Sequence, residues 1–398
     1  MKEGWSNCKI GDICSITDFV SNGSFASLKE NVKYYNSPNY AVLVRLADAS
    51  NGFDKSKFVY TDEHGYDFSK KSHLHGGELI MSNVGSVGSM FICPVMKQPM
   101  TLAPNTISIT SQNNTFLYYY FLSDEFKAKL KGITSSTTLK KFNKTNFKLL
   151  EICIPSLSEQ QSIVDYLDYA FAKIDAMKAN AEKALGEAKA LFQASLKEML
   201  EPKEGWEEKK LGDVGTFIRG GNFSKKDFVE DGYPCIHYGQ IHTKFGVATF
   251  EHLSCVPETM VKKERCASKG DLVIAITSED DEGSCKCTAW MADYDAYVGG
   301  HTAIFKHNLN PIYVSYYFKA ARFQKDKLDY THGFKVVEIS PKDIAKIPIC
   351  YPSAEEQQSI VDTLDSLKSK VDRLQANYEK ISQECDALKQ AILRQVFE

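Results

Sequence analysis

The sequence predicts an α+β fold of two tandem globular units of mixed α/β type, each followed by a long helix. The two helices are expected to pair as an antiparallel coiled coil with pseudo-twofold symmetry. ICIPSLSEQQSIVD at residues 152–165 returns as ICYPSAEEQQSIVD at residues 349–362, and a shorter EGW repeat opens each half at residues 3–5 and 204–206. A heptad pattern of apolar residues then runs through both copies of the longer repeat. Duplication on this scale indicates two equivalent structural units.

The repeats divide the chain into four parts. The offset between copies falls from 201 residues in the short repeat to 197 in the long one, and the sequences between the repeats share little. We therefore expect a variable unit, a shared helix, a second variable unit and a second shared helix, at residues 1–155, 156–203, 204–352 and 353–398.

Composition is typical of a globular protein in a reducing compartment. The chain has 398 residues, 43% of them hydrophobic, without an apolar run of about 18 residues or an apolar signal sequence at its start. Its 11 cysteines include no CxxC pair, so we expect buried thiols and a cytoplasmic protein. The formal net charge of −3 does not by itself indicate a nucleic-acid-binding protein, because such modules are usually more basic.

Apolar runs and their spacing predict the elements of the variable units. Strands are expected near residues 40–46, 78–83 and 106–110 in the first unit and near 272–277 and 301–306 in the second. Helices should follow near residues 116–130 and 311–330.

Each copy of the long repeat begins with a helix start signal. A proline is followed by a serine suited to the N-cap and, three residues later, by a glutamate that can complete a capping box. These residues are Pro155, Ser156 and Glu159 in the first copy and Pro352, Ser353 and Glu356 in the second.

The apolar residues of both helices recur at alternating spacings of four and three. If 163 lies opposite 392, the alanines of the first helix face the larger aliphatic residues of the second, which permits close packing. The alternative is that each helix only covers its own unit, but about 40 residues at 1.5 Å each make a helix of about 60 Å, longer than such a unit needs. The predicted helix-pair interface comprises Ile163, Leu167, Ile174, Ala181, Ala184, Ala188, Leu364, Leu367, Val371, Leu374, Ile381 and Leu388.

Motifs of the common enzyme classes are missing from the sequence. It contains no GxG, no Gly-Lys pair of a Walker A loop, and no GxSxG or HExxH. Cys285 and Cys287 with His301 and His307 do not match a familiar zinc spacing, and the acidic run at residues 279–282 is expected to point into solvent. We therefore expect no catalytic residue, no metal and no cofactor.

The duplicated order of features resembles the DNA-specificity subunit of type I restriction-modification enzymes. That order is a Trp with a following Gly-Asp, a variable region, a proline before EQQSIV, and a long helix. The resemblance covers the whole chain and implies a non-catalytic protein whose variable units are target-recognition domains. Each would read one half of an asymmetric split site in double-stranded DNA. The helices would space the domains and dock DNA methyltransferase subunits, usually two, which motor-endonuclease subunits join for restriction.

Base readout requires hydrogen-bonding side chains on exposed loops, with Lys and Arg on the surrounding phosphates. Residues 135–140 and 333–336 lie in the stretch that resembles the DNA-facing segment of the family. In the first unit the candidates are Asn22, Ser24, Arg45, Asn83, Ser86, Thr137, Thr138, Lys140 and Lys141. In the second they are Arg219, Asn222, Ser224, Lys225, Tyr238, Gln240, His242, His332 and Lys335.

Two other functions compete with sequence reading. A partner-binding scaffold of another defence assembly would suit the modest charge, and it would not itself read sequence. An enzyme is disfavoured by the missing motifs.

Overall fold

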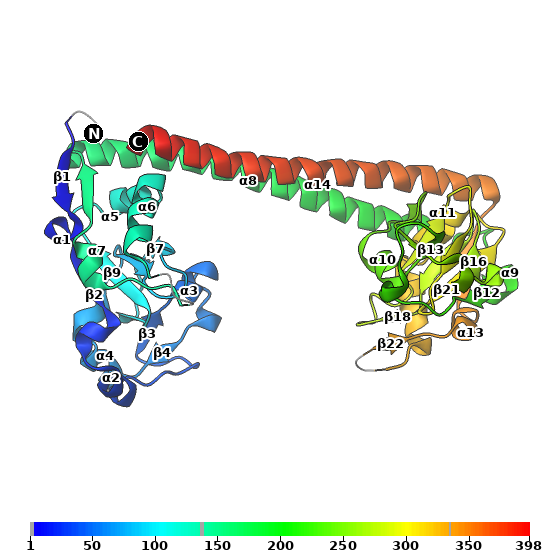
Figure 1. Ribbon diagram of the computed structural model, residues 1–398, viewed down its shortest axis with the longest axis horizontal. Coiled ribbons are helices and arrows are strands. Elements are labelled where there is room, and N and C mark those ends of the chain that lie inside the picture. The colour runs from blue at the N-terminus through cyan, green and yellow to red at the C-terminus, as the bar shows by residue number, and fades with distance from the viewer. Residues whose placement is uncertain (1–3, 136–138, 334–335) are drawn as a thin grey trace. The chain divides into compact units, whose positions relative to one another are not determined.

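A computed structural model describes residues 4–135, 139–333 and 336–398 of the chain. They divide into unit 1, made of residues 1–180 and 379–398, and unit 2, residues 181–378 (Figure 1). Both predicted long helices are present, α8 at Leu157–Leu200 and α14 at Ala354–Phe397. Each long helix lies partly in unit 1 and partly in unit 2. The predicted fold class, mixed units each followed by a long helix, is confirmed.

Unit 1 contains two four-stranded sheets, ordered β2-β9-β6-β7 and β4-β3-β8-β5, and a two-stranded sheet β1-β10. Only the β3–β8 pair is parallel among these described strands. The strands are β1 Ser6–Lys9, β2 Ser15–Asp18, β3 Ala41–Val44, β4 Tyr60–Thr61, β5 His73–Leu74, β6 Leu79–Ser82, β7 Met90–Ile92, β8 Met100–Leu102, β9 Thr106–Thr110 and β10 Glu151–Ile154. The short helices are α1 Ile10–Ile13, α2 Phe25–Asn31, α3 Leu46–Ser50, α4 Glu63–Phe68, α5 Asn114–Phe121, α6 Asp124–Ile133 and α7 Lys144–Lys148.

Unit 2 repeats this topology with an added edge strand in its first sheet and an added two-stranded pair. Its sheets are ordered β12-β21-β17-β19-β14 and β15-β13-β20-β16, with the pairs β11-β23 and β18-β22. The strands are β11 Glu207–Lys210, β12 Gly215–Arg219, β13 Tyr233–Ile236, β14 Ala248–Thr249, β15 Ser254–Val256, β16 Cys266–Ala267, β17 Leu272–Ala275, β18 Thr277–Ser278, β19 Cys287–Trp290, β20 Ala296–Val298, β21 Thr302–His307, β22 Val337–Glu338 and β23 Pro348–Tyr351. The helices are α9 Leu211–Val214, α10 Tyr238–Thr243, α11 Pro311–Tyr317, α12 Ala321–Asp326 and α13 Pro341–Ile344. As in unit 1, the central pair of the second sheet, β13 and β20, is parallel.

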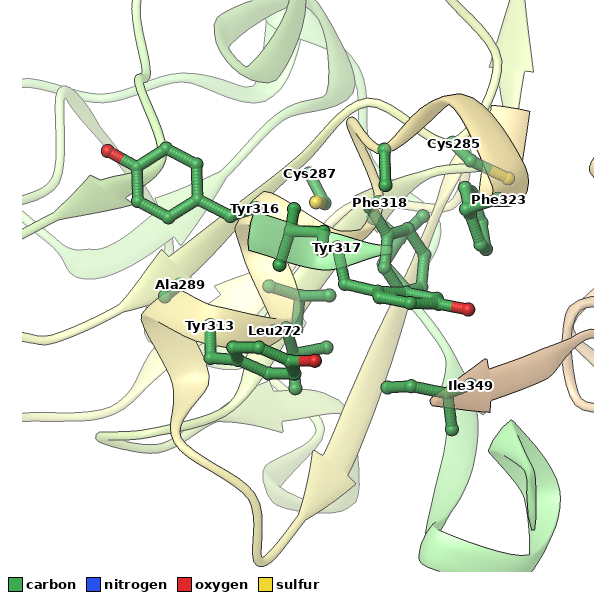
Figure 2. Close-up of a cluster of buried hydrophobic side chains, with 14 of the residues drawn as sticks. Leu272, Cys285, Cys287, Ala289, Tyr313, Tyr316, Tyr317, Phe318, Phe323 and Ile349 are labelled. Atoms are coloured by element: carbon green, nitrogen blue, oxygen red, sulfur yellow. The ribbon is translucent and has the colours of Figure 1, made fainter. Parts of the chain in front are cut away.

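An aromatic helix fills the core of each unit between a sheet and the long helices. In unit 2 the aromatic residues of α11 pack against β17 and β19 (Figure 2). Tyr313 and Tyr317 donate hydrogen bonds to the carbonyls of Cys350 and Pro348. The counterpart in unit 1 is α5, whose Phe116 and Tyr120 lie beside Phe397 at the end of α14. Burial of this many aromatic side chains stabilises the unit and fixes the long helices to it.

The same tyrosine–aspartate hydrogen bond ties each aromatic helix to a long helix. Tyr119 donates to Asp168 at 2.5 Å in unit 1, and Tyr316 donates to Asp365 at 2.7 Å in unit 2. Both pairs are 49 residues apart, so this docking contact belongs to the duplicated part of the fold.

The serine N-caps of the predicted helix starts are present, and each glutamate accepts a hydrogen bond that was not expected. Ser156 and Ser353 accept hydrogen bonds from the amides of Glu159 and Glu356. Each glutamate carboxylate also accepts a hydrogen bond from an indole, Trp5 at 3.0 Å in unit 1 and Trp206 at 3.3 Å in unit 2. The short EGW repeat therefore contacts the long repeat in both units.

Within each unit the long helices run antiparallel, as predicted. In unit 1 Lys389 pairs with Asp175 at 2.5 Å and Lys178 pairs with Asp386 at 3.6 Å. In unit 2 Lys189 donates to Gln375 at 2.8 Å. The predicted register is wrong by about one turn, because the Cys385 thiol lies 3.7 Å from the Ile174 carbonyl, where Ile381 was expected.

The phase of the predicted seam on α8 is also partly wrong. The buried stripe includes Val164, Leu185 and Phe192, whereas Ala184 and Leu191 one position earlier are exposed. The reason is that α8 packs on the globular cores as well as on α14, so its larger side chains face the cores. On α14 Leu388 is exposed and Lys389 takes the place expected for it.

The other predicted interface residues lie on the buried or half-buried faces. Leu167, Ile174, Leu364 and Val371 are buried. Half-buried positions are Ile163, Ala181, Ala188, Leu367, Leu374 and Ile381.

All five predicted strands are confirmed, as β3, β6, β9, β17 and β21. Each predicted helix of the variable units is divided, the first into α5 and α6 and the second into α11, α12 and a 3-10 helix at Lys327–Tyr330. Ser123 accepts a hydrogen bond from the Phe126 amide and starts α6, while α11 ends at Tyr317 and α12 begins at Ala321. A serine that can cap a new helix explains the break in unit 1.

Candidate nucleic-acid interface

The repeated topology brings the same two turns together in both units. Because β3 and β8 are parallel, the residues after both strands meet at one sheet edge, and the Ala103 amide donates to the Val44 carbonyl at 3.1 Å. In unit 2 the Gly299 amide donates to the Ile236 carbonyl at 2.9 Å in the same way. The carboxyl ends of adjacent parallel strands are a frequent place for a binding crevice.

In unit 1 these turns form one side of an open cleft. The loop after β6 forms the other side, since the Asn83 amide donates to the Asn105 carbonyl at 3.1 Å. The cleft is lined by Arg45, Leu46, Ala47, Ser82, Val84, Gly85, Ser86, Ala103, Pro104, Asn105 and Thr106.

A basic segment borders the unit 1 cleft. The Gly85 amide donates to the Lys140 carbonyl at 2.9 Å, and Val84 forms a β-bridge with Lys141. Both lysines are exposed. Their ammonium groups are therefore available to anions beside the cleft.

Arg45 enters this cleft in a fixed conformation. Its Nε and Nη2 donate to the two carboxylate oxygens of Asp48 at 3.2 and 2.6 Å, and Nη2 also donates to the Lys57 carbonyl at 2.7 Å. Asp48 is only 1% exposed and also accepts the amide of Arg45, the N-cap residue of α3, at 2.8 Å. The Arg45 side chain itself remains 32% exposed.

In unit 2 the equivalent position carries aromatic and imidazole rings. Tyr238 lies 5.2 Å from His301 and 6.1 Å from His242, measured between ring centroids. Two adjoining hollows share Tyr238 and His301. Their other lining residues include Asn222, Ser224, Lys225, His237, His242, Thr277, Glu279, Asp280, Lys286 and Val336.

The charges in the unit 2 cleft are mixed. Lys225 and Lys286 line it together with Glu279 and Asp280. Burial, with further contributions from Lys225 and His301, lowers the pKa of His237. The neutral His237 ring can therefore accept a hydrogen bond, and it does so from the Gly239 amide at 3.2 Å.

The structure places several sequence-predicted residues at the clefts. In unit 1 Arg45 and Ser86 line the cleft, and Asn83, Lys140 and Lys141 border it through backbone contacts. In unit 2 Asn222, Ser224, Lys225, Tyr238 and His242 lie together. Their contacts with DNA stay predictions.

Other predicted residues have structural partners. Asn22 donates to Ser72 and Phe19, and Ser24 caps α2. Gln240 accepts the His237 amide and donates to Ser254. Arg219 pairs with Glu338 at 3.2 Å, and His332 exchanges backbone hydrogen bonds with the same residue. Thr137, Thr138 and Lys335 lie outside the described residues.

Sequence reasoning missed Asn105 and His301 as cleft residues. Both follow a parallel strand and precede the next strand at the same topological position. A sequence signal was present at Asn105, since the Pro104-Asn105 pair is typical of a turn, and Asn105 does adopt the left-handed conformation there, with φ of 68°. At His301 the preceding glycine pair was the only comparable signal.

Neither a metal group nor a membrane span is found in the described ranges. No cluster of three His, Cys, Asp or Glu side chains there is arranged to hold an ion. No helix formed by the described residues has the length and apolar character needed to cross a bilayer.

Known proteins and a family model are similar to this chain in sequence. The family model for the type I restriction modification DNA specificity domain matches twice, at residues 2–185 and 203–383. A stretch of 196 residues, 48% of the chain, is 27% identical to the type I restriction enzyme StySPI specificity subunit of Salmonella potsdam and covers 42% of it. The chain thus spans less than half the length of that relative.

Two further similar proteins are matched over more of their length. The type I restriction enzyme MjaVIII specificity subunit of Methanocaldococcus jannaschii is 26% identical over 283 residues, 66% of each chain. A solved structure from work on complex assembly and conformational transition of the type I restriction-modification system aligns with a TM-score of 0.73 and 19% identity. It covers 100% of this chain and 98% of that one, which shows a shared fold.

Proposed function

Because the chain belongs to the family of type I restriction-modification DNA specificity domains, we propose that it is the sequence-reading subunit of such a complex. In this proposal each unit binds one half of a bipartite site in double-stranded DNA. The subunit itself performs no chemistry and needs no cofactor.

The observation that carries the proposal is a cleft at the same topological position in both units, with different linings. Arg45, Ser86 and Asn105 line it in unit 1, and Tyr238 and His301 line it in unit 2. Side chains that differ at equivalent positions present different donor and acceptor patterns to a base pair. The two half-sites should therefore differ in sequence.

Phosphate contacts are expected from the lysines at the clefts. Lys140 and Lys141 border the unit 1 cleft, and Lys225 and Lys286 line that of unit 2. These are few charges against a net formal charge of −3, so the isolated chain should bind DNA weakly. Partner subunits supply the remaining contacts.

The long helices are the proposed docking sites for DNA methyltransferase subunits, two in number, with motor-endonuclease subunits joining the restriction complex. Exposed apolar side chains on α8, among them Tyr166, Tyr169 and Met177, support this assignment. Large apolar groups on a helix surface are typical of contacts with another protein.

Co-expression with the DNA methyltransferase subunit of its own system tests the proposed function. Sequencing of adenine and cytosine methylation in the host DNA should show one bipartite motif with an unspecified gap. Methylation at random sites, or methyl transfer by the purified chain with S-adenosylmethionine alone, would contradict the proposal.

A further inference from the structure

Arg45 has the features of a side chain prepared for a ligand. One edge of its guanidinium is held by a carboxylate that is 1% exposed, and its Nη2 is also held by the Lys57 carbonyl. Among the described residues, no acceptor is within hydrogen-bond range of Nη1, which keeps two N–H donors. A guanidinium fixed before binding loses little conformational freedom when a ligand arrives.

The pairing with Asp48 decides which ligand suits these donors. A cation that is ion-paired with a buried carboxylate carries little net charge, yet its free N–H groups keep their direction. Such a group attracts a phosphate weakly, but it can still donate to a neutral acceptor. Guanine presents two adjacent acceptors, O6 and N7, in the major groove, whereas adenine presents one acceptor beside an amino donor.

The surroundings of Arg45 also fit a base better than a phosphate. The cleft walls beside it are apolar or neutral, from Ala47, Val84, Pro104, Ser86 and Asn105. The lysines lie at the border, on the segment that contacts Gly85. The side chains suited to contact DNA base edges are thus separate from the lysines suited to contact DNA phosphates.

Unit 2 has no arginine at the equivalent position. There the residue after the parallel strand is His237, whose amide donates to Gln240 at 2.9 Å, and Gln240 donates to Ser254 at 2.9 Å. Both units therefore have a hydrogen bond from the backbone amide at this position to the side chain three residues later. Only unit 1 has an ion pair there, between Arg45 and Asp48.

We propose that Arg45 reads a guanine in the half-site bound by unit 1, and that Asp48 is the positioning residue that directs its guanidinium. This inference rests on the proposed function, because it requires unit 1 to bind DNA in the cleft.

The test uses the full-length chain in complex with its methyltransferase. The half-motif of unit 1 is first identified as the half that persists when residues 206–349 are exchanged for those of a relative. Duplexes then carry adenine or 7-deazaguanine, which lacks the N7 acceptor, at each guanine of that half. The wild-type complex should methylate one substituted duplex about tenfold more slowly than the native one, because the Nη1 donors lose a guanine acceptor that they contact.

Three variants separate a base contact from other roles. Arg45→Ala should methylate the native and substituted duplexes at nearly equal rates, while its preferences in the unit 2 half stay unchanged. Arg45→Lys keeps the charge but cannot make the two hydrogen bonds to Asp48 that direct the guanidinium, so it should weaken the guanine preference. Asp48→Asn should weaken that same preference, with folding checked by thermal unfolding.

Several results overturn the inference. A half-motif of unit 1 without guanine does so, as do equal losses on all duplexes in Arg45→Ala, which indicate a phosphate contact. Full guanine preference in Arg45→Lys also contradicts it. A wild-type complex that methylates no bipartite site would overturn the proposed function itself, whereas a bipartite site indifferent to Arg45 overturns only this inference.

Discussion

Two leucines on α14 provide a matched test of how the long helices pack. Leu393 is 1% exposed in the core of unit 1, and Leu388, five residues earlier, is 47% exposed. Leu393→Ala and Leu388→Ala make the same chemical change on the same helix. The sequence-derived seam contained Leu388, so the two variants also decide between the predicted and the observed phase.

The expected costs differ by several kcal/mol. Truncation of a fully buried leucine to alanine removes its burial and leaves a cavity, which typically costs about 2–5 kcal/mol. For a unit of this size, each kcal/mol lowers the melting temperature by roughly 2–4 °C, so a loss of about 3 kcal/mol in Leu393→Ala lowers the unit 1 transition by roughly 6–12 °C. Leu388→Ala should change stability by less than about 0.5 kcal/mol.

Scanning calorimetry of the full chain measures both variants, and a second pair assigns the transitions. Leu185 is 6% exposed and Leu191 is 58% exposed on α8, both within unit 2. Leu185→Ala should lower the unit 2 transition and Leu191→Ala should leave it in place. Equal shifts for Leu388→Ala and Leu393→Ala would refute the observed helix phase.

Three further predictions concern pH, docking and distance. Burial lowers the pKa of His307 to about 4, so stability should fall as pH drops from about 6.5 towards 4, by roughly 1–2 kcal/mol at pH 5. Urea unfolding of wild type and His307→Leu checks this, and an equal pH slope in the variant would speak against it. Tyr119→Phe and Tyr316→Phe should each cost about 1–2 kcal/mol through the lost hydrogen bond to aspartate, whereas Tyr166→Phe, an exposed control, should cost almost nothing in the same assay. Seven residues inserted after both Ala184 and Ile381 should lengthen the unspecified gap in the methylated motif by about three base pairs, given about 1.5 Å per helical residue and 3.4 Å per base pair. An active complex with an unchanged gap would show that these helices do not set the spacing.

The sequence was sufficient for the architecture because the duplication is explicit. The helix starts at Ser156 and Ser353 follow from local capping signals, whereas the antiparallel direction of the long helices was expected from the family resemblance. The seam phase did not follow, since α8 carries apolar residues on two adjacent stripes. Packing against α5 and α11 selects the stripe with Val164 and Phe192, and this contact is not visible in the helix sequence alone.

The candidate site was only partly predictable for the same kind of reason. Arg45, Ser86 and Tyr238 were found because polar residues on loops near strands are a general signal. Asn105 and His301 become neighbours of those residues only through the parallel pairs β3–β8 and β13–β20. Asn22 and Gln240 resemble readers in sequence, but they bond to nearby groups of their own unit.

Exchange of one unit tests most directly whether each unit reads its own half-site. Residues 206–349 are replaced by the corresponding residues of another family member, and the chimera is expressed with the methyltransferase subunit. Methylome sequencing should show a bipartite motif in which one half is new and the other half is that of the wild type. A change in both halves, or in neither, would contradict the account.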